Sequence, residues 1–94
     1  MVSGEYLEKV RFAVRRNSND KVDSELTDII EQCRADLVLK GIPAEVAEDE
    51  NNVLVLGCQR AFARWQFGIS GDDAERNHED YIIMADELRK NGSE

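Results

Sequence analysis

Residues 63–76 read ARWQFGISGDDAER, and they join two stretches in which apolar residues recur with helical spacing. Gly68 can take the left-handed conformation that ends a helix, and Gly71 opens the turn that follows. Asp72 is placed to cap the next helix, with Glu75 three residues later in the position of a capping box. We therefore interpret this segment as a corner between two helices and not as a loop that carries out chemistry.

The helix before this corner is predicted over residues 52–67, and it is apolar on two sides. Advancing each residue by 100° places a main apolar stripe on one face and a second apolar set on the far face. A helix of this kind lies at the centre of a domain or at an interface. The main stripe holds Leu54, Cys58, Ala61, Phe62 and Trp65, and the second face holds Val53, Leu56, Ala63 and Phe67.

The same periodicity predicts three more helices, each with a single apolar face. No segment alternates with period two for long enough to indicate a strand, so the expected fold class is all-α. The three helices are predicted at about 3–16, 21–40 and 73–90. Their inward residues are Tyr6, Leu7, Val10, Ala13 and Val14 in the first, Val22, Leu26, Ile29, Ile30, Cys33 and Leu37 in the second, and Ala74, His78, Tyr81, Ile82, Ala85 and Leu88 in the last.

Helix ends complete the expected architecture, a small bundle of four helices with a longer connector between the second and the third. Ser3 suits the N-cap of the first helix, and Gly41 suits the position after the end of the second. The charged connector 43–52 has room for one helical turn. Residues 1–94 are expected to form a single domain, with disorder in the free subunit at the connector and at residues 91–94.

Composition limits the classes of function. The 94 residues carry a net charge of −8, which argues against a protein that binds nucleic acid by neutralising phosphates. Residues 1–21 hold five basic and three acidic side chains (+2), which leaves seven basic and seventeen acidic in residues 22–94 (−10). We found neither a signal-peptide core nor an apolar run of membrane-spanning length, so a soluble intracellular protein with no membrane partner is expected.

The sequence contains none of the common catalytic or metal-binding patterns. His78 is the sole histidine, and Cys33 and Cys58 are the only thiols. His78 and both cysteines fall on inward helix faces, where a buried histidine and reduced thiols are the ordinary outcome. No zinc-ligand spacing, calcium loop, nucleophile elbow or phosphate-binding glycine loop is present. The sequence therefore predicts a protein that is not an enzyme and needs no cofactor or metal.

Several side chains are candidates for contacts with partners. Phe12 and Ile83 lie roughly opposite the apolar faces of their helices, either as scattered surface residues or as anchors buried against neighbouring subunits. Phe67, on the second face of its helix, either locks the bundle or meets a neighbour. The basic residues expected around Phe12 are Lys9, Arg11, Arg15 and Arg16. The acidic residues of the connector, Glu45, Glu48, Asp49 and Glu50, form either a solvated loop or a partner contact.

Three stretches together resemble the head–tail connector proteins of long-tailed bacteriophages, which are also called head-completion or DNA-packaging proteins. The first is YLEKVRFAVRRNSNDKVDSELTDIIEQCRADLVLKGI (6–42), a short helix, a polar break and an acidic second helix. The second is RAFARWQFG (60–68), a helix that ends on an aromatic residue and Phe-Gly. The third is DDAERNHEDYIIMADEL (72–88), with an acidic cap, Glu-Arg and a later Tyr.

The resemblance implies a function that composition does not reveal. Proteins of this family form a ring beneath the portal protein after the genome is packaged. The ring extends the DNA channel and docks the next head-completion or tail protein, with DNA only as passing cargo. The resemblance therefore implies a non-enzymatic virion protein at the head–tail interface, present in the bacterial cytoplasm before assembly.

Two alternatives stay open at this point. The chain is also compatible with a small acidic helical protein that regulates or binds another protein. A third interpretation comes from VDSEL (22–26), which resembles the Asp-Ser-Leu signature of acyl carrier proteins, in which the serine carries phosphopantetheine. Here Glu25 separates Ser24 from Leu26, and Ser24 lies inside a predicted helix.

Overall fold

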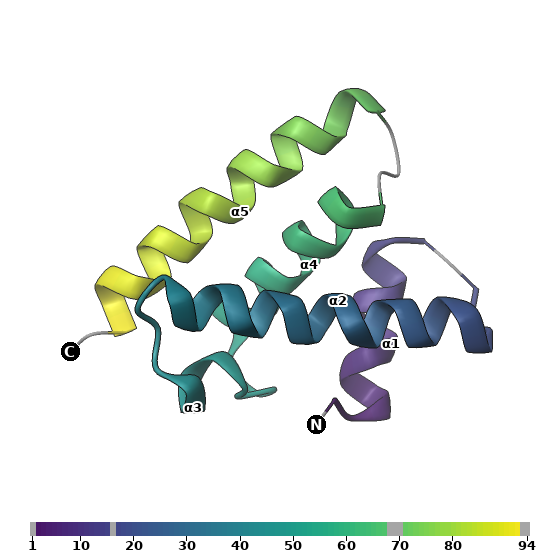
Figure 1. Ribbon diagram of the computed structural model, residues 1–94, viewed down its shortest axis with the longest axis horizontal. Coiled ribbons are helices and arrows are strands. Elements are labelled where there is room, and N and C mark those ends of the chain that lie inside the picture. Colours follow the sequence, from purple (N-terminus) through teal and green to yellow (C-terminus); the bar gives the residue numbers. More distant parts are fainter. Residues whose placement is uncertain (1, 16, 68–70, 93–94) are drawn as a thin grey trace.

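Five helices form the described part of the chain (Figure 1). The computed structural model describes residues 2–15, 17–67 and 71–92, and no strand occurs among them. The all-α prediction is therefore confirmed, with one short helix inside the connector. In chain order the helices are α1 (Gly4–Ala13), α2 (Asp20–Leu39), α3 (Ala44–Ala47), α4 (Val53–Phe67) and α5 (Gly71–Gly92).

Two predicted helix ends are confirmed by their hydrogen bonds. The Ser3 hydroxyl accepts a hydrogen bond from the Tyr6 backbone N–H at 3.2 Å, as an N-cap does. Gly41 has φ +101°, and the next N–H, that of Ile42, donates to the carbonyl of Leu37 at 3.1 Å. This closing pattern satisfies a free carbonyl at the end of α2 and buries Ile42 beside the core.

The first helix is shorter than predicted. It ends at Ala13, because buried Val14 caps it and Arg15 turns the chain with φ +55°. The second helix then begins at Asp20, where the side chain of Asn19 accepts a hydrogen bond from a backbone N–H in the first turn.

Helix α4 occupies the centre of the fold. It packs against α1, α2 and α5, and it runs antiparallel to α5 (Figure 1). The predicted phase of α4 is wrong at its start, since Leu54 is 56% exposed whereas Val55 is fully buried. Gln59, which the sequence leaves outside the apolar faces, is also fully buried. Because neighbours surround α4 on three sides, its buried arc is wider than an apolar stripe indicates.

The corner between α4 and α5 is only partly described. Gly68, predicted to end the helix, and the side chain of Asp72, predicted to cap the next one, lie outside the described residues. Helix α5 begins at Gly71, ahead of the predicted start, which places Asp72 inside its first turn instead of at the N-cap. Ile82, predicted inward, is 44% exposed because α2 and α5 diverge around it. In the described residues no helix is both long and apolar enough to cross a membrane.

Candidate functional site: exposed apolar surfaces

The most exposed aromatic side chain is that of Phe12, on the outer face of α1. It is 85% exposed, as the sequence predicts. Lys9, Arg60 and two glutamates surround a hollow of about 380 Å³ beside its ring. Arg15, just beyond α1, is also exposed. We call Lys9, Phe12 and Arg15 the Phe12 surface.

One predicted member of this surface, Arg11, is placed differently. The Arg11 guanidinium turns toward α2, where it pairs with the carboxylate of Asp23 at 3.1 Å and is 18% exposed. The hydroxyl of Ser18 donates to the same carboxylate at 2.9 Å. Arg11 therefore ties α1 to α2, and Arg16 lies outside the described residues.

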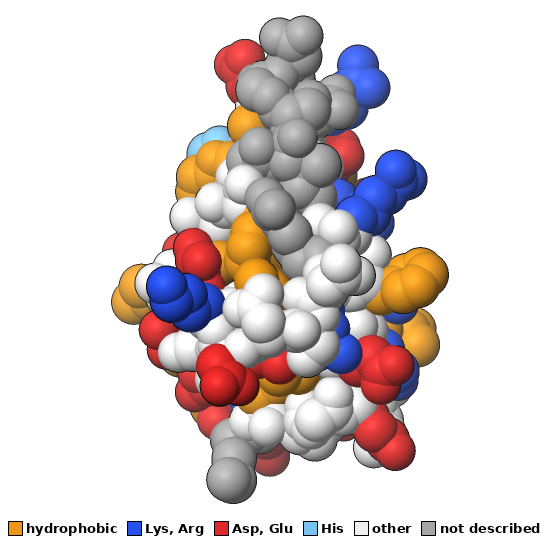
Figure 2. Space-filling view, turned by 90° about the vertical axis from the view of Figure 1, so that its right-hand side faces the viewer, with side chains coloured by type: hydrophobic (Ala, Val, Ile, Leu, Met, Phe, Trp, Pro, Cys, Tyr) orange, Lys and Arg blue, Asp and Glu red, His pale blue; other side chains and the backbone are white. Residues whose placement is uncertain are grey.

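A second apolar surface follows α4 and α5 on the side where α4 begins. Ile83 is 58% exposed, which agrees with its predicted outward position. Beside it, Val53, Leu54 and Met84 are exposed around a hollow of about 270 Å³. Phe67, at the end of α4, is half-buried and packs against the core. In Figure 2 apolar side chains stand at several separate places among charged ones on the face shown.

A third surface, which the sequence did not indicate, is a groove between α2 and α5. The two helices diverge, and the C-terminal half of α4 forms the floor of a hollow of about 400 Å³. We call it the α2–α5 groove. Its apolar lining consists of Ala35 and Leu39 from α2, Phe62 and Trp65 from α4, and Tyr81 and Ile82 from α5.

Aromatic contacts give the groove a rigid floor. The rings of Trp65 and His78 stack at 3.9 Å between centroids, and Phe62 meets the edges of Trp65 and Tyr81. Trp65 was predicted to lie in the main core stripe, but it is half-buried and reaches the groove. His78 is likewise half-buried and not enclosed.

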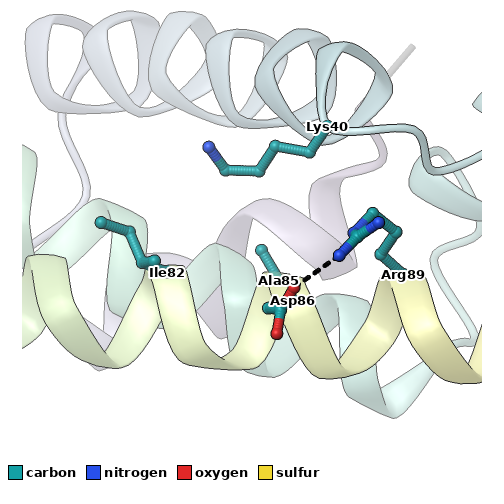
Figure 3. A pocket seen from close by; sticks show the side chains of 5 residues that line it. All are labelled: Lys40, Ile82, Ala85, Asp86 and Arg89. Carbon is teal, nitrogen blue, oxygen red and sulfur yellow. Dashed lines mark hydrogen bonds and ion pairs between the residues drawn. The ribbon is translucent and has the colours of Figure 1, made fainter.

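Ion pairs close one end of the groove. Lys40 of α2 pairs with Asp36 at 3.2 Å, and Arg89 of α5 pairs with Asp86 at 2.8 Å. Figure 3 shows Lys40 facing α5 across a smaller hollow of about 230 Å³, which Ile82 also lines. The phenol of Tyr81 donates to Asp36 at 2.5 Å. The cationic groups at this end therefore have carboxylate partners.

The acidic connector divides into exposed and structural residues. Glu45, Glu48 and Asp49 are exposed. The carboxylate of Glu50 instead accepts hydrogen bonds from the backbone N–H of Ser3 at 2.9 Å and from the Ser3 hydroxyl. It also pairs with Arg34 at 3.3 Å. Burial alone would raise the pKa of Glu50, but these hydrogen bonds outweigh it and lower the pKa.

The polar side chains inside the core, Arg34 and Gln59, contact other residues of the fold. Arg34 is buried, lies over the ring of Tyr6 at 5.6 Å and pairs with Glu31 as well as with Glu50. Gln59 donates from its amide nitrogen to the carbonyl of Ile30 at 3.1 Å. Its amide oxygen accepts no hydrogen bond from the described residues.

The two cysteines are buried reduced thiols, as predicted. Burial raises the pKa of the Cys58 thiol to about 11, and burial also raises the pKa of Cys33. A thiol that stays protonated is a poor nucleophile and a poor metal ligand. Among the described residues, no group of three or more histidine, cysteine or acidic side chains is arranged to hold a metal ion.

The described surface thus offers apolar and charged patches for macromolecular contacts. Comparison of the chain with known protein families, with curated proteins and with solved structures found no match.

Proposed function

We propose that the chain is a non-enzymatic subunit of a phage or prophage head–tail connector. In this role it forms a ring beneath the portal protein, extends the DNA channel and docks the next head-completion or tail protein. The finer architecture in this proposal is a small bundle of four helices with a longer connector between the second and the third, as the helical spacing of the sequence predicts. The observation that carries the proposal is the exposure of large apolar side chains on separate faces of a small helical domain.

Separate faces matter because of how rings are built. In a ring each subunit presents one surface to the neighbour on one side and a different surface to the neighbour on the other side. Phe12 on α1 and Leu39 at the end of α2 are each 85% exposed, and Ile83 on α5 is 58% exposed. Side chains of this kind, with charged residues around them, are typical anchors of protein interfaces.

The acidic balance of the chain fits a channel through which DNA passes. Like charges repel, so a wall rich in carboxylates lets DNA slide past without binding it. With a net charge of −8, the chain has the acidic excess that such a wall requires. If the positions that face the channel in an assembled ring were mostly lysine and arginine, this part of the proposal would be wrong.

Electron microscopy of a portal complex tests the proposal. The chain is imaged in negative stain at high concentration, alone and after mixing with the portal protein encoded in the same genome. We expect ring-shaped density that lengthens the portal channel, and a gene that lies just after the portal and capsid genes. If no complex forms with the portal protein, the proposal fails.

A small helical interaction protein is the second candidate, because the α2–α5 groove has the size and apolar lining of a binding site. Such a protein would form a complex of fixed small stoichiometry and no ring. The carrier interpretation rests on Ser24, an exposed residue inside α2. Intact-mass measurement of the protein from its host tests it, since a phosphopantetheine adduct on Ser24 would favour a carrier.

A further inference from the structure

We infer that the α2–α5 groove receives the Phe12 surface of a second copy of this chain. The inference names the two surfaces that meet when copies assemble, so it rests on the self-association contained in the proposed function. It is based on three observations: the shape of the groove, the charges beside it and the position of α1 relative to it.

The groove fits an aromatic side chain. Its floor holds the stacked rings of Trp65 and His78, and its walls hold the exposed side chains of Leu39 and Ile82. A volume of about 400 Å³ lies in the range of sites that enclose small organic groups, about 300–1,000 Å³. Aromatic rings meet one another favourably edge to face or offset, beyond the gain from burial alone. Phe12, 85% exposed, is such a ring on a protruding helix.

Charges beside the two surfaces are complementary. Glu75 and Glu79 are exposed on α5 and lie one turn from the groove residues His78 and Ile82. Asp28 is exposed on α2 and lies one turn before the groove residue Gln32.

The cations at the closed end of the groove, Lys40 and Arg89, are already paired with carboxylates. At the open end, the exposed acidic residues Asp28, Glu75 and Glu79 outnumber exposed Arg76, so the described residues there carry net negative charge. Around Phe12 the basic residues Lys9, Arg15 and Arg60 outnumber the acidic residues Glu5 and Glu8, so the net charge that enters the groove is opposite to that of its open end.

Phe12 cannot enter the groove of its own chain, because α1 lies on the opposite side of α4. Arg64 of α4 donates from Nε to the carbonyl of Ala13 at 3.3 Å, which places α1 against the Arg64 side of α4. Phe62 and Gln66, which line the groove, are each two residues from Arg64 and lie on the opposite side of the helix.

The contact is consequently heterologous, since it joins two different surfaces of the same chain. Each copy that offers its Phe12 surface keeps its own groove free for the next copy. Repetition of such a contact produces a closed ring or an open filament, whereas a two-fold dimer would need a self-complementary patch.

A mixing experiment tests this arrangement. Phe12→Ser removes the ring, and Leu39→Lys places a positive charge in the groove; both positions are exposed, so neither change disturbs the core. In sedimentation velocity, each variant alone should stay monomeric where the wild type associates. The mixture should form a 1:1 dimer and nothing larger. The Leu39→Lys chain supplies the one intact Phe12 surface, and the Phe12→Ser chain supplies the one intact groove. Val38→Ser, exposed on α2 but not part of the groove lining, serves as the matched control and should associate as the wild type does.

Disulfide cross-linking locates the contact directly. Mixed Glu8→Cys and Leu39→Cys chains, oxidised with copper phenanthroline, should give a covalent heterodimer, because Glu8 is exposed beside Phe12 and its replacement keeps the ring. The native Cys33 and Cys58 are buried and do not compete. A mixture of Glu8→Cys with Val53→Cys is the control, because Val53 is exposed outside the groove. Equal cross-linking in both mixtures, or no cross-linking in the first, overturns the inference.

The outcomes separate this contact from the proposed function. Rings on the portal protein that persist with both Phe12→Ser and Leu39→Lys overturn the groove contact and leave the function standing. Specific cross-links between position 8 and position 39 without any portal complex support the contact and overturn the function. Cross-links from Glu8→Cys to the portal protein, in place of a second copy, also overturn the contact. A wild-type chain that stays monomeric at every concentration, with and without portal protein, overturns both.

Discussion

Glu50 shows how one residue can organise a connector. Its carboxylate joins the start of α1, through Ser3, to buried Arg34 in α2. Glu50→Gln removes the charge and weakens these bonds, so we expect a loss of about 1–2 kcal/mol in the free energy of unfolding at pH 7. Urea unfolding measures it. Glu45→Gln is the matched control, because Glu45 lies exposed in the same connector; an equal loss there would contradict a specific role for Glu50.

The pH dependence of this loss follows from the lowered pKa of Glu50. A carboxyl whose pKa is lower in the folded than in the unfolded protein stabilises the fold above its unfolded pKa, ordinarily 4.5. This stabilisation disappears as the pH falls through the folded-state pKa. The difference in unfolding free energy between the wild type and Glu50→Gln should therefore be full at neutral pH and shrink below pH 4.5. If the difference in unfolding free energy between the wild type and Glu50→Gln grew as the pH fell, it would contradict a lowered pKa for Glu50.

Gly41 holds a backbone conformation that other residues rarely adopt. Its φ of +101° allows the closing hydrogen bond at the end of α2. A Cβ at this position would meet the Arg89 side chain at an ordinary 3.6 Å, so backbone strain and not a clash decides the effect. We expect Gly41→Ala to lower the unfolding free energy by about 1 kcal/mol in urea titration. Gly4→Ala, with open space around it in the first turn of α1, should leave stability unchanged or higher.

Arg15 offers the converse test. It is a non-glycine residue with φ +55°, in the position after the end of α1 where glycine is preferred. Arg15→Gly should raise the unfolding free energy by up to about 1 kcal/mol, because the left-handed conformation carries no penalty for glycine. Arg15→Lys keeps the strain and should not stabilise. If both variants were equally stable in urea titration, the left-handed backbone at Arg15 would carry no penalty.

At the scale of elements, the packing of α4 on α2 contains an imperfectly paired polar group. Gln59 is fully buried and bonds the Ile30 carbonyl, yet its amide oxygen has no donor in the described core. Gln59→Met keeps the length of the side chain, loses one hydrogen bond and removes the unpaired oxygen. Since an unpaired buried group costs about 1–3 kcal/mol and a typical hydrogen bond contributes about 1, we expect unchanged or higher stability in thermal and urea unfolding. Gln59→Glu buries a charge instead and should destabilise; a strongly destabilised Gln59→Met would show that the amide is fully satisfied.

Element prediction succeeded where a helix buries one face. In α1 and α2, residues such as Val10, Leu26 and Leu37 are fully buried, as the helical spacing indicates. It failed for α4, because a helix enclosed on three sides has no single stripe whose phase can be read. Exposed Leu54 and buried Gln59 are the result.

The candidate surfaces were predictable to the same extent. Phe12 and Ile83 are visible in the sequence because each sits on a polar face of its helix. The α2–α5 groove was not predicted, since it depends on the divergence of two helices that are distant in the chain. The partners of Glu50 were missed for the same reason, because Ser3 lies 47 residues away.

At the scale of the whole molecule, the positive and negative charges of the chain are distributed unevenly over the helices. Among the described basic residues of the first 21 positions, Lys9 and Arg11 lie on α1, Arg15 lies just after it and Lys21 lies in the first turn of α2; Arg11 already pairs with Asp23 of α2. The remaining chain is strongly acidic. Association through the Phe12 surface should therefore weaken as salt screens opposite charges, in addition to losing affinity when the aromatic anchor is removed.

Phe12 and Phe67 separate assembly from stability. Phe67 is half-buried against the core at the end of α4, so Phe67→Ala should lower the unfolding free energy by about 1–3 kcal/mol. Phe12 is exposed, and Phe12→Ala should change stability by less than about 0.5 kcal/mol while weakening self-association about tenfold or more. Urea unfolding at low protein concentration isolates the first quantity, because association would otherwise add apparent stability. Sedimentation velocity measures the second at high concentration. A Phe12→Ala chain that unfolded at lower urea concentration than the wild type would contradict a role for Phe12 in assembly alone. A Phe67→Ala chain of unchanged stability would contradict a role for Phe67 in the core.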